Sequence, residues 1–161
     1  MKALSNFALA AGIVIAAPAV AQTMAPADYV AKAGASDLYE RTSSKLMLES
    51  SKNEKIRQFA QMMVTDHTKS TNDVKAAAKQ SGLTPPPPKL DPEQSRMMGQ
   101  LRQASGDARD RLYVTQQKTA HQKALALHQG YAANGTAAPL KAVAAQVAPV
   151  VQHHLEMLNG M

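Results

Sequence analysis

Apolar residues recur at intervals of three and four along most of this chain, a spacing that places them on one face of an α-helix. The clearest case runs from residue 54 to residue 81. Asn53 before it is a good N-cap residue, and Gly82 after it suits the left-handed position that often follows a helix. Its predicted inward positions are Ile56, Phe59, Met63, His67, Ser70, Val74 and Ala77.

The same spacing predicts three more long helices and one short helix, over residues 28–50, 108–133, 139–158 and 92–104. The inward face of the first helix is the least apolar, and its predicted positions are Tyr29, Ala33, Ser36, Glu40, Ser44 and Met47. Asp91 and Asp107 are the predicted N-caps of the short helix and of the third long helix. Pro149 lies inside the last helix and should kink or bulge it.

The connection between the second and third long helices is unusually long. Residues 84–88 read Thr-Pro-Pro-Pro-Pro, and consecutive prolines favour an extended conformation. With the short helix, this connection reaches about 48 Å, whereas a 25-residue helix is about 38 Å long. It can therefore cross the bundle, and the alternative is a long excursion between antiparallel helices. The sequence predicts an all-α protein, a ferritin-like four-helix bundle with a short extra helix in the crossover.

The N-terminal segment, residues 1–21, has the order of a cleavable signal peptide. Lys2 is positive, residues 7–17 are apolar but too short to span a bilayer comfortably, and residues 19–21 read Ala-Val-Ala, which matches the A-x-A cleavage pattern. We expect cleavage after Ala21, export to the periplasm, and a single domain over residues 22–161. An uncleaved anchor is the alternative. No later stretch is apolar enough to form a transmembrane segment.

Composition narrows the classes of function. The chain has no cysteine, which excludes disulfide scaffolds, thiol redox motifs and lipid-modified cysteines. Its formal net charge is +6, but basic and acidic residues are interleaved along the helices, without an aromatic platform or a Gly-rich basic loop. We therefore expect no nucleic-acid partner. The positive charge is compatible with peripheral association with an anionic envelope surface, and no specific partner is indicated.

Four potential metal ligands lie on the inward faces of four different predicted helices: Glu40, His67, His121 and His154. A buried imidazole or carboxylate needs a polar partner, so we expect these residues to contact one another or a metal ion. Glu40 and His67 are at similar heights in antiparallel helices, and His121 is also near mid-helix. His154 fits less well, because it lies about five residues, or about 7.5 Å, further from its turn than His121.

Three imidazoles and one carboxylate suit a single transition-metal ion, either zinc, iron, manganese or copper. A ferritin-type di-iron centre needs Glu-x-x-His on two helices, but Val64 and Val151 occupy those glutamate positions, so none is expected. Asp66, Asp110 and Tyr113 are candidates for hydrogen bonds around the ligands, with a core role as the alternative for Tyr113. A metal-free cluster of hydrogen-bonded polar groups is the alternative for the whole site.

Three segments resemble an exported bacterial family known as domain of unknown function 4142. They are FAQMMVTDHTKS (59–70), DRLYVTQQKTAHQKAL (110–125) and APVVQHHLEM (148–157). The positions that match the family's motifs are Met63, Asp66, His67, Tyr113, His121, Pro149, His154 and Leu155, with Glu40 as the acid of the first helix. The resemblance implies a ferritin-like bundle and no known activity. Members are often labelled "predicted outer membrane protein".

The leading functional hypothesis is a metal-binding or stress-related protein of the cell envelope. One alternative is a mononuclear-metal redox enzyme, and another is a structural or partner-binding module whose polar core holds no metal. No catalytic residue or substrate can be identified from the sequence, so binding is favoured over enzymatic activity.

Overall fold

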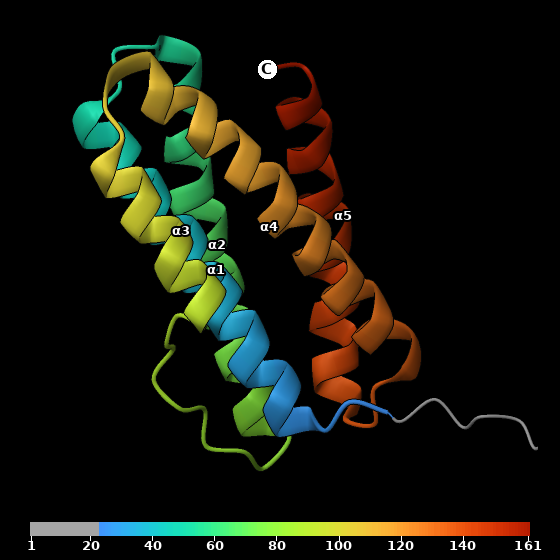
Figure 1. Ribbon diagram of the computed structural model, residues 1–161. Coiled ribbons are helices and arrows are strands. Elements are labelled where there is room, and N and C mark those ends of the chain that lie inside the picture. The colour runs from blue at the N-terminus through green and yellow to red at the C-terminus, as the bar shows by residue number, and fades with distance from the viewer. Residues whose placement is uncertain (1–22) are drawn as a thin grey trace, which may run out of the picture.

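The computed structural model describes residues 23–161, which form five helices and no strand (Figure 1). The helices are α1 (Pro26–Ser50), α2 (Glu54–Gln80), α3 (Pro92–Gln103), α4 (Gly106–Asn134) and α5 (Ala138–Asn159). They correspond to the five predicted helices in the predicted order, so the all-α prediction is confirmed. The predicted signal peptide and its cleavage point lie outside the described residues.

The four long helices form a bundle in which α1 pairs with α2 and α4 pairs with α5 (Figure 1). Ser51 Oγ, just after α1, donates a 2.9 Å hydrogen bond to Asp110 near the start of α4. Tyr29 at the start of α1 is hydrogen-bonded to His128 near the end of α4. Helix α4 is therefore antiparallel to α1 and parallel to α2. The segment 81–91 and α3 together make the predicted crossover.

Most helix ends follow the local sequence signals. The side chain of Asn53 accepts two backbone N–H groups at the start of α2, and Asp91 forms a capping box at the start of α3. Gly82 adopts a left-handed φ of 73° after α2, as predicted. The prediction that Asp107 caps α4 is wrong. Ser105 precedes this helix, and Asp107 lies in its first turn, where a negative charge complements the helix dipole.

Helix α5 continues through Pro149. Because proline has no N–H to donate, the carbonyl group of Ala145 lacks its usual helical partner, and the helix is locally weaker there. The inward face of α5 consists mainly of valine and leucine.

None of the helices within residues 23–161 combines the length and apolarity needed to cross a membrane.

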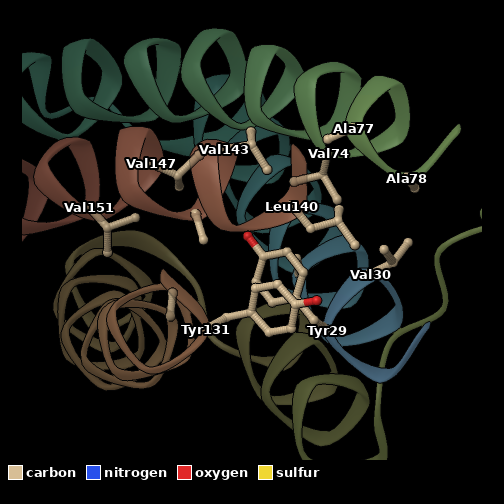
Figure 2. Close-up of a cluster of buried hydrophobic side chains, with 13 residues drawn as sticks. Tyr29, Val30, Val74, Ala77, Ala78, Tyr131, Leu140, Val143, Val147 and Val151 are labelled. Atoms are coloured by element: carbon tan, nitrogen blue, oxygen red, sulfur yellow. The ribbon is translucent and has the colours of Figure 1, made fainter. Parts of the chain in front are cut away.

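The bundle interior contains two apolar clusters separated by a polar layer. One cluster surrounds the stacked rings of Tyr29 and Tyr131, whose centroids lie 4.0 Å apart (Figure 2). The other packs Phe59 and Tyr113 against buried methionines nearer the opposite end of the bundle. The buried polar residues between them include Asp37, Glu40, His67, His121 and His154. Such a layer is costly unless its members are paired with one another or with a ligand.

Candidate metal centre

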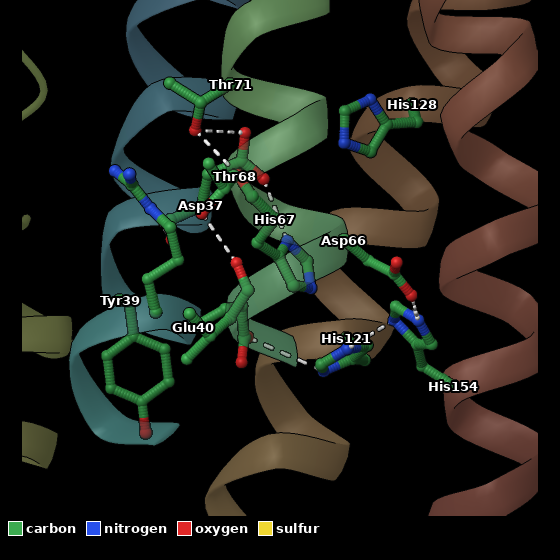
Figure 3. A network of polar contacts seen from close by, with 12 residues as sticks. Asp37, Tyr39, Glu40, Asp66, His67, Thr68, Thr71, His121, His128 and His154 are labelled. Atoms are coloured by element: carbon green, nitrogen blue, oxygen red, sulfur yellow. Dashed lines mark hydrogen bonds and ion pairs between the residues drawn. The ribbon is translucent and has the colours of Figure 1, made fainter. Parts of the chain in front are cut away.

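Three of the four predicted ligands come together in the polar layer (Figure 3). His67 from α2, His121 from α4 and His154 from α5 each place a ring nitrogen within 4.8 Å of the others. Their ring centroids are 5.3–5.6 Å apart, and none of the three residues is more than 3% exposed. We call these residues the histidine triad.

The height difference between His154 and His121 is smaller than expected. Helix α4 ends at Asn134 and α5 begins at Ala138. Counted from these two ends, His154 lies about three residues further from the turn than His121, which corresponds to about 4.5 Å of helix rise. The expected offset of five residues, about 7.5 Å, is therefore wrong, and the predicted ends at residues 133 and 139 already give three residues. The smaller offset allows the two imidazoles to meet.

Hydrogen bonds fix the orientation of His121 and His154. Nδ1 of His121 donates to the backbone carbonyl of Gln117 at 3.0 Å, and Nε2 of His154 donates to Oδ2 of Asp66 at 3.0 Å. Because these two partners are acceptors, each donating nitrogen must carry the ring proton. In the neutral rings, the remaining nitrogens carry lone pairs. These nitrogens, His121 Nε2 and His154 Nδ1, face each other at 3.3 Å.

The pKa values of these two rings favour the neutral state. Burial lowers the pKa of His121 well below its ordinary value, and the neighbouring His67 and His154 lower it further. Burial also lowers the pKa of His154 to about 4, although the adjacent Asp66 acts in the opposite direction. Near neutral pH there is thus no proton for a hydrogen bond between the two facing nitrogens. A bound cation would relieve the repulsion between these two lone pairs.

The third imidazole, His67, is held by a buried aspartate. Nδ1 of His67 donates to Oδ1 of Asp37 at 2.9 Å, and Oδ2 of Asp37 accepts the hydroxyl of Thr71 at 3.0 Å (Figure 3). Burial lowers the pKa of His67, but Asp37, with the charges of Glu40 and Asp66, more than offsets this and raises it overall. Nε2 of His67 is buried and has no hydrogen-bond partner among residues 23–161.

Asp37 was missed in the sequence, where Ser36 was predicted to face inward. Asp37 is 2% exposed, whereas Ser36 is partly exposed. The sequence contained a signal for Asp37. Tyr29, Ala33 and Asp37 are spaced by four residues and Glu40 follows after three, which is a more regular inward face for the first helix than one that includes Ser36. Asp37 is as far from the end of α1 as His67 is from the start of α2, so the two are level in this antiparallel pair.

Glu40 is buried beside the triad but is not among its closely spaced ligand atoms. Its Oε1 lies 3.5 Å from Nδ1 of His121, whereas Nε2 of that ring faces His154. Within the described part of the chain, neither carboxylate oxygen has a hydrogen-bond partner. Burial raises the pKa of Glu40 to about 7, against the opposing influence of His67. Glu40 is therefore a buried acid behind His121.

The other predicted supporting residues differ in position. Asp66 contacts His154 directly, as described above. Tyr113 is hydrogen-bonded to Ser44 at 2.7 Å, and Asp110 accepts from Ser51. Neither Tyr113 nor Asp110 forms a hydrogen bond or ion pair with the triad within residues 23–161, so both lie outside its immediate surroundings.

His128 provides a test of how burial affects this core. Burial lowers its pKa from 6.5 to about 4. The unfolded chain therefore binds a proton at His128 more readily than the folded protein does. As the pH falls from 6.5 toward 4, this difference lowers the free energy of unfolding. We expect the stability of the wild type, relative to His128→Gln, to fall by about 3 kcal/mol between pH 7 and pH 4. Urea unfolding of both proteins at pH 7 and pH 4, with chelator present, measures these free energies. The same change with pH in both proteins would contradict the prediction.

The triad could hold a metal ion, and one pair of its ring nitrogens has the separation expected of two ligands on one ion. Zinc–nitrogen bonds of about 2.05 Å in tetrahedral geometry separate two ligand nitrogens by about 3.3 Å. His121 and His154 have this separation. In addition, metal-binding histidines commonly donate their other N–H to a carboxylate or a backbone carbonyl, and all three rings here do so.

Comparisons with known proteins place the fold in a wider context. A DUF305 fragment from Deinococcus radiodurans has a TM-score of 0.71 and 19% identity, covering 84% of this chain and 93% of that chain. A DUF305 protein from Streptomyces coelicolor, named as a presumed secreted protein, has a TM-score of 0.69 and 12% identity, covering 83% of this chain and 88% of that chain. At these identities the similarity shows the fold alone.

No curated protein matches the chain. The family described as "Domain of unknown function (DUF4142)" matches residues 14–161, which include all the described helices and every residue of the histidine triad. The resemblance found in the three sequence segments is thereby confirmed, and the chain belongs to the DUF4142 family.

Proposed function

We propose that this protein binds one transition-metal ion through His67, His121 and His154. The observation that supports this most strongly is the pair of facing nitrogens on His121 and His154, 3.3 Å apart, whose rings donate their protons elsewhere. The unpartnered Nε2 of His67 supplies a third donor. Binding requires Nε2 of His67 to carry no proton, because only a deprotonated nitrogen can coordinate a metal.

The donor set favours zinc, copper or iron over manganese within the four metals considered. Imidazole suits zinc, copper and iron, whereas manganese prefers carboxylate and water ligands. Glu40 is proposed as the fourth ligand, since its two oxygens lack hydrogen-bond partners in the described structure and it adjoins His121. This role requires its side chain to turn toward the triad. Otherwise Glu40 would supply negative charge that stabilises the bound cation.

Metal analysis tests the proposal. The purified protein, stripped with chelator, should bind one equivalent of Zn²⁺ or Cu²⁺ in equilibrium titration, and the double variant His67→Ala, His121→Ala should lose that equivalent. The matched control is His153→Gln, which removes an exposed imidazole adjacent to His154. Folding of each variant is checked by circular dichroism. An unchanged stoichiometry in the folded double variant, or no uptake by the wild type, would reject the site.

We also propose that the protein is exported and acts in the periplasm or at the envelope surface. The signal-peptide pattern before residue 22 supports export, and the fold is similar to that of the presumed secreted Streptomyces coelicolor protein. Together with the proposed metal site, this location supports a metal-binding or stress-related role in the cell envelope. Cell fractionation of the full-length protein, with Ala21→Asp as the cleavage-site variant, tests export and processing.

A further inference from the structure

A small surface cavity lies between α2 and α5, directly beside the histidine triad. Its volume is about 120 Å³. Asp66, Ser70 and Asp73 line it from α2, while Val147 and Val150 line it from α5. The cavity is distinct from the triad itself, since none of the three histidines lines it.

Asp66 connects this cavity to the buried site. Its side chain is 35% exposed, yet its Oδ2 accepts the 3.0 Å hydrogen bond from Nε2 of His154. One carboxylate thus touches both the surface cavity and a ring of the triad. The larger cavity formed by α1, α3 and α4 has no comparable residue, because no acid in its lining forms a hydrogen bond or ion pair with the triad in the part of the chain that the structure describes.

Ser70 is a second polar feature of the cavity. The residue is 7% exposed, and its Oγ is buried without a hydrogen-bond partner in the described structure. An unpaired buried hydroxyl is unfavourable unless a ligand or water satisfies it. Ser70 lies one helical turn after Asp66, and Asp73 lies three residues further along α2, so these three oxygen-bearing residues share one face of the helix.

The opposite wall of the cavity is the part of α5 weakened by Pro149. Val147 and Val150 flank this proline, and the carbonyl of Ala145 lacks its helical partner. Small displacements of this wall cost less than they would in an uninterrupted helix. Because the triad residues are at most 3% exposed, an ion must displace some part of the bundle to reach them.

We propose that divalent cations reach the histidine triad through this cavity, where Asp66, Ser70 and Asp73 supply oxygen atoms and Asp66 leads to His154. The proposal rests on the proposed metal-binding function. Carboxylates near an opening raise the local cation concentration and the association rate. Lys69, which is paired with Asp73 at 2.6 Å, moderates this attraction at the outer end.

Charge substitutions at the cavity test the route. Val150 is 42% exposed and lines the cavity, so Val150→Glu and Val150→Lys place opposite charges at the same point. The matched control is the pair Gln122→Glu and Gln122→Lys, at an exposed position adjacent to His121 on another helix. The association rate of Co²⁺, followed by its absorption in stopped flow, is measured at low ionic strength for all four variants and the wild type.

We expect Val150→Glu to bind Co²⁺ about tenfold faster than Val150→Lys, because a divalent ion interacts strongly with a unit charge along its path when screening is weak. The two Gln122 variants should differ by less than about twofold. If the Glu-to-Lys ratio of the Co²⁺ association rates is similar at positions 150 and 122, or larger at 122, the proposed route is wrong, although the metal site itself is not contradicted. Absence of Co²⁺ and Zn²⁺ binding to the wild type at equilibrium would overturn both.

Discussion

Zinc, held at a free concentration about a thousandfold above its dissociation constant, should raise the free energy of unfolding by about 4 kcal/mol. The folded protein alone brings the three imidazoles together, whereas the unfolded chain separates them and binds zinc weakly. For a domain of this size, the expected increase in Tm is about 10 °C. Thermal unfolding followed by circular dichroism, with zinc and with chelator, measures the difference.

The single variant His67→Gln should lose most of this zinc-dependent increase, whereas the exposed control His153→Gln should keep it. The increase should also shrink at pH 5, because the raised pKa of His67 lets a proton compete with the metal for its ring. An equal increase in Tm for wild type and His67→Gln would mean that zinc stabilises the protein from another site.

Replacing Asp37 with alanine should lower the free energy of unfolding of the metal-free protein by about 4 kcal/mol. The substitution removes the acceptor for Nδ1 of His67 and for the hydroxyl of Thr71. Both donors are buried, and the favourable charge beside His67 disappears as well. Removing one member of such a pair is costly because the other stays buried without compensation. Urea unfolding at pH 7 with chelator present measures the effect.

Two further variants show whether the loss of stability comes from the Asp37 carboxylate. Ser36→Ala, at the adjacent and partly exposed position, should change stability by less than about 0.5 kcal/mol. Asp37→Asn keeps an oxygen that can accept from His67 but removes the charge, so it should be less destabilising than Asp37→Ala. It should still weaken zinc binding by about 10–100-fold, as expected for loss of a carboxylate that orients a ligand. Equal stability of the Asp37→Ala and Ser36→Ala proteins would contradict this account.

The helices and their order could be predicted because the relevant signals are local. The three-and-four spacing of α2, the cap at Asn53 and the left-handed Gly82 each depend on a few neighbouring residues. The length of residues 84–88 and the short helix allowed the crossover but did not exclude an excursion between antiparallel helices, and the contacts of α4 with α1 decided between them. The prediction that Asp107 caps α4 was wrong because the neighbouring Ser105 and Gly106 are also suited to the start of a helix, and α4 begins there.

The site was only partly predictable. His67, His121 and His154 stood out because imidazoles on apolar faces need partners. Ser36 and Asp37 both fitted the inward stripe of α1 approximately, and the choice between them depends on how far that helix is rotated about its axis. Packing against α2 and α4 sets this rotation, which brings Asp37 to His67 and leaves Glu40 behind His121.

The amino-acid sequence by itself determined that this chain forms a four-helix bundle with a connection long enough to cross it, and that imidazoles lie on the inward faces of three helices. Helix period, capping and connection length act over short stretches of chain, so they can be recognised without coordinates. Only the tertiary structure decided which ring nitrogens face one another, which acid holds His67, and where the buried site approaches the surface. These features depend on the rotation and relative height of separate helices, where a shift of one residue turns a side chain by about 100° and moves it by about 1.5 Å.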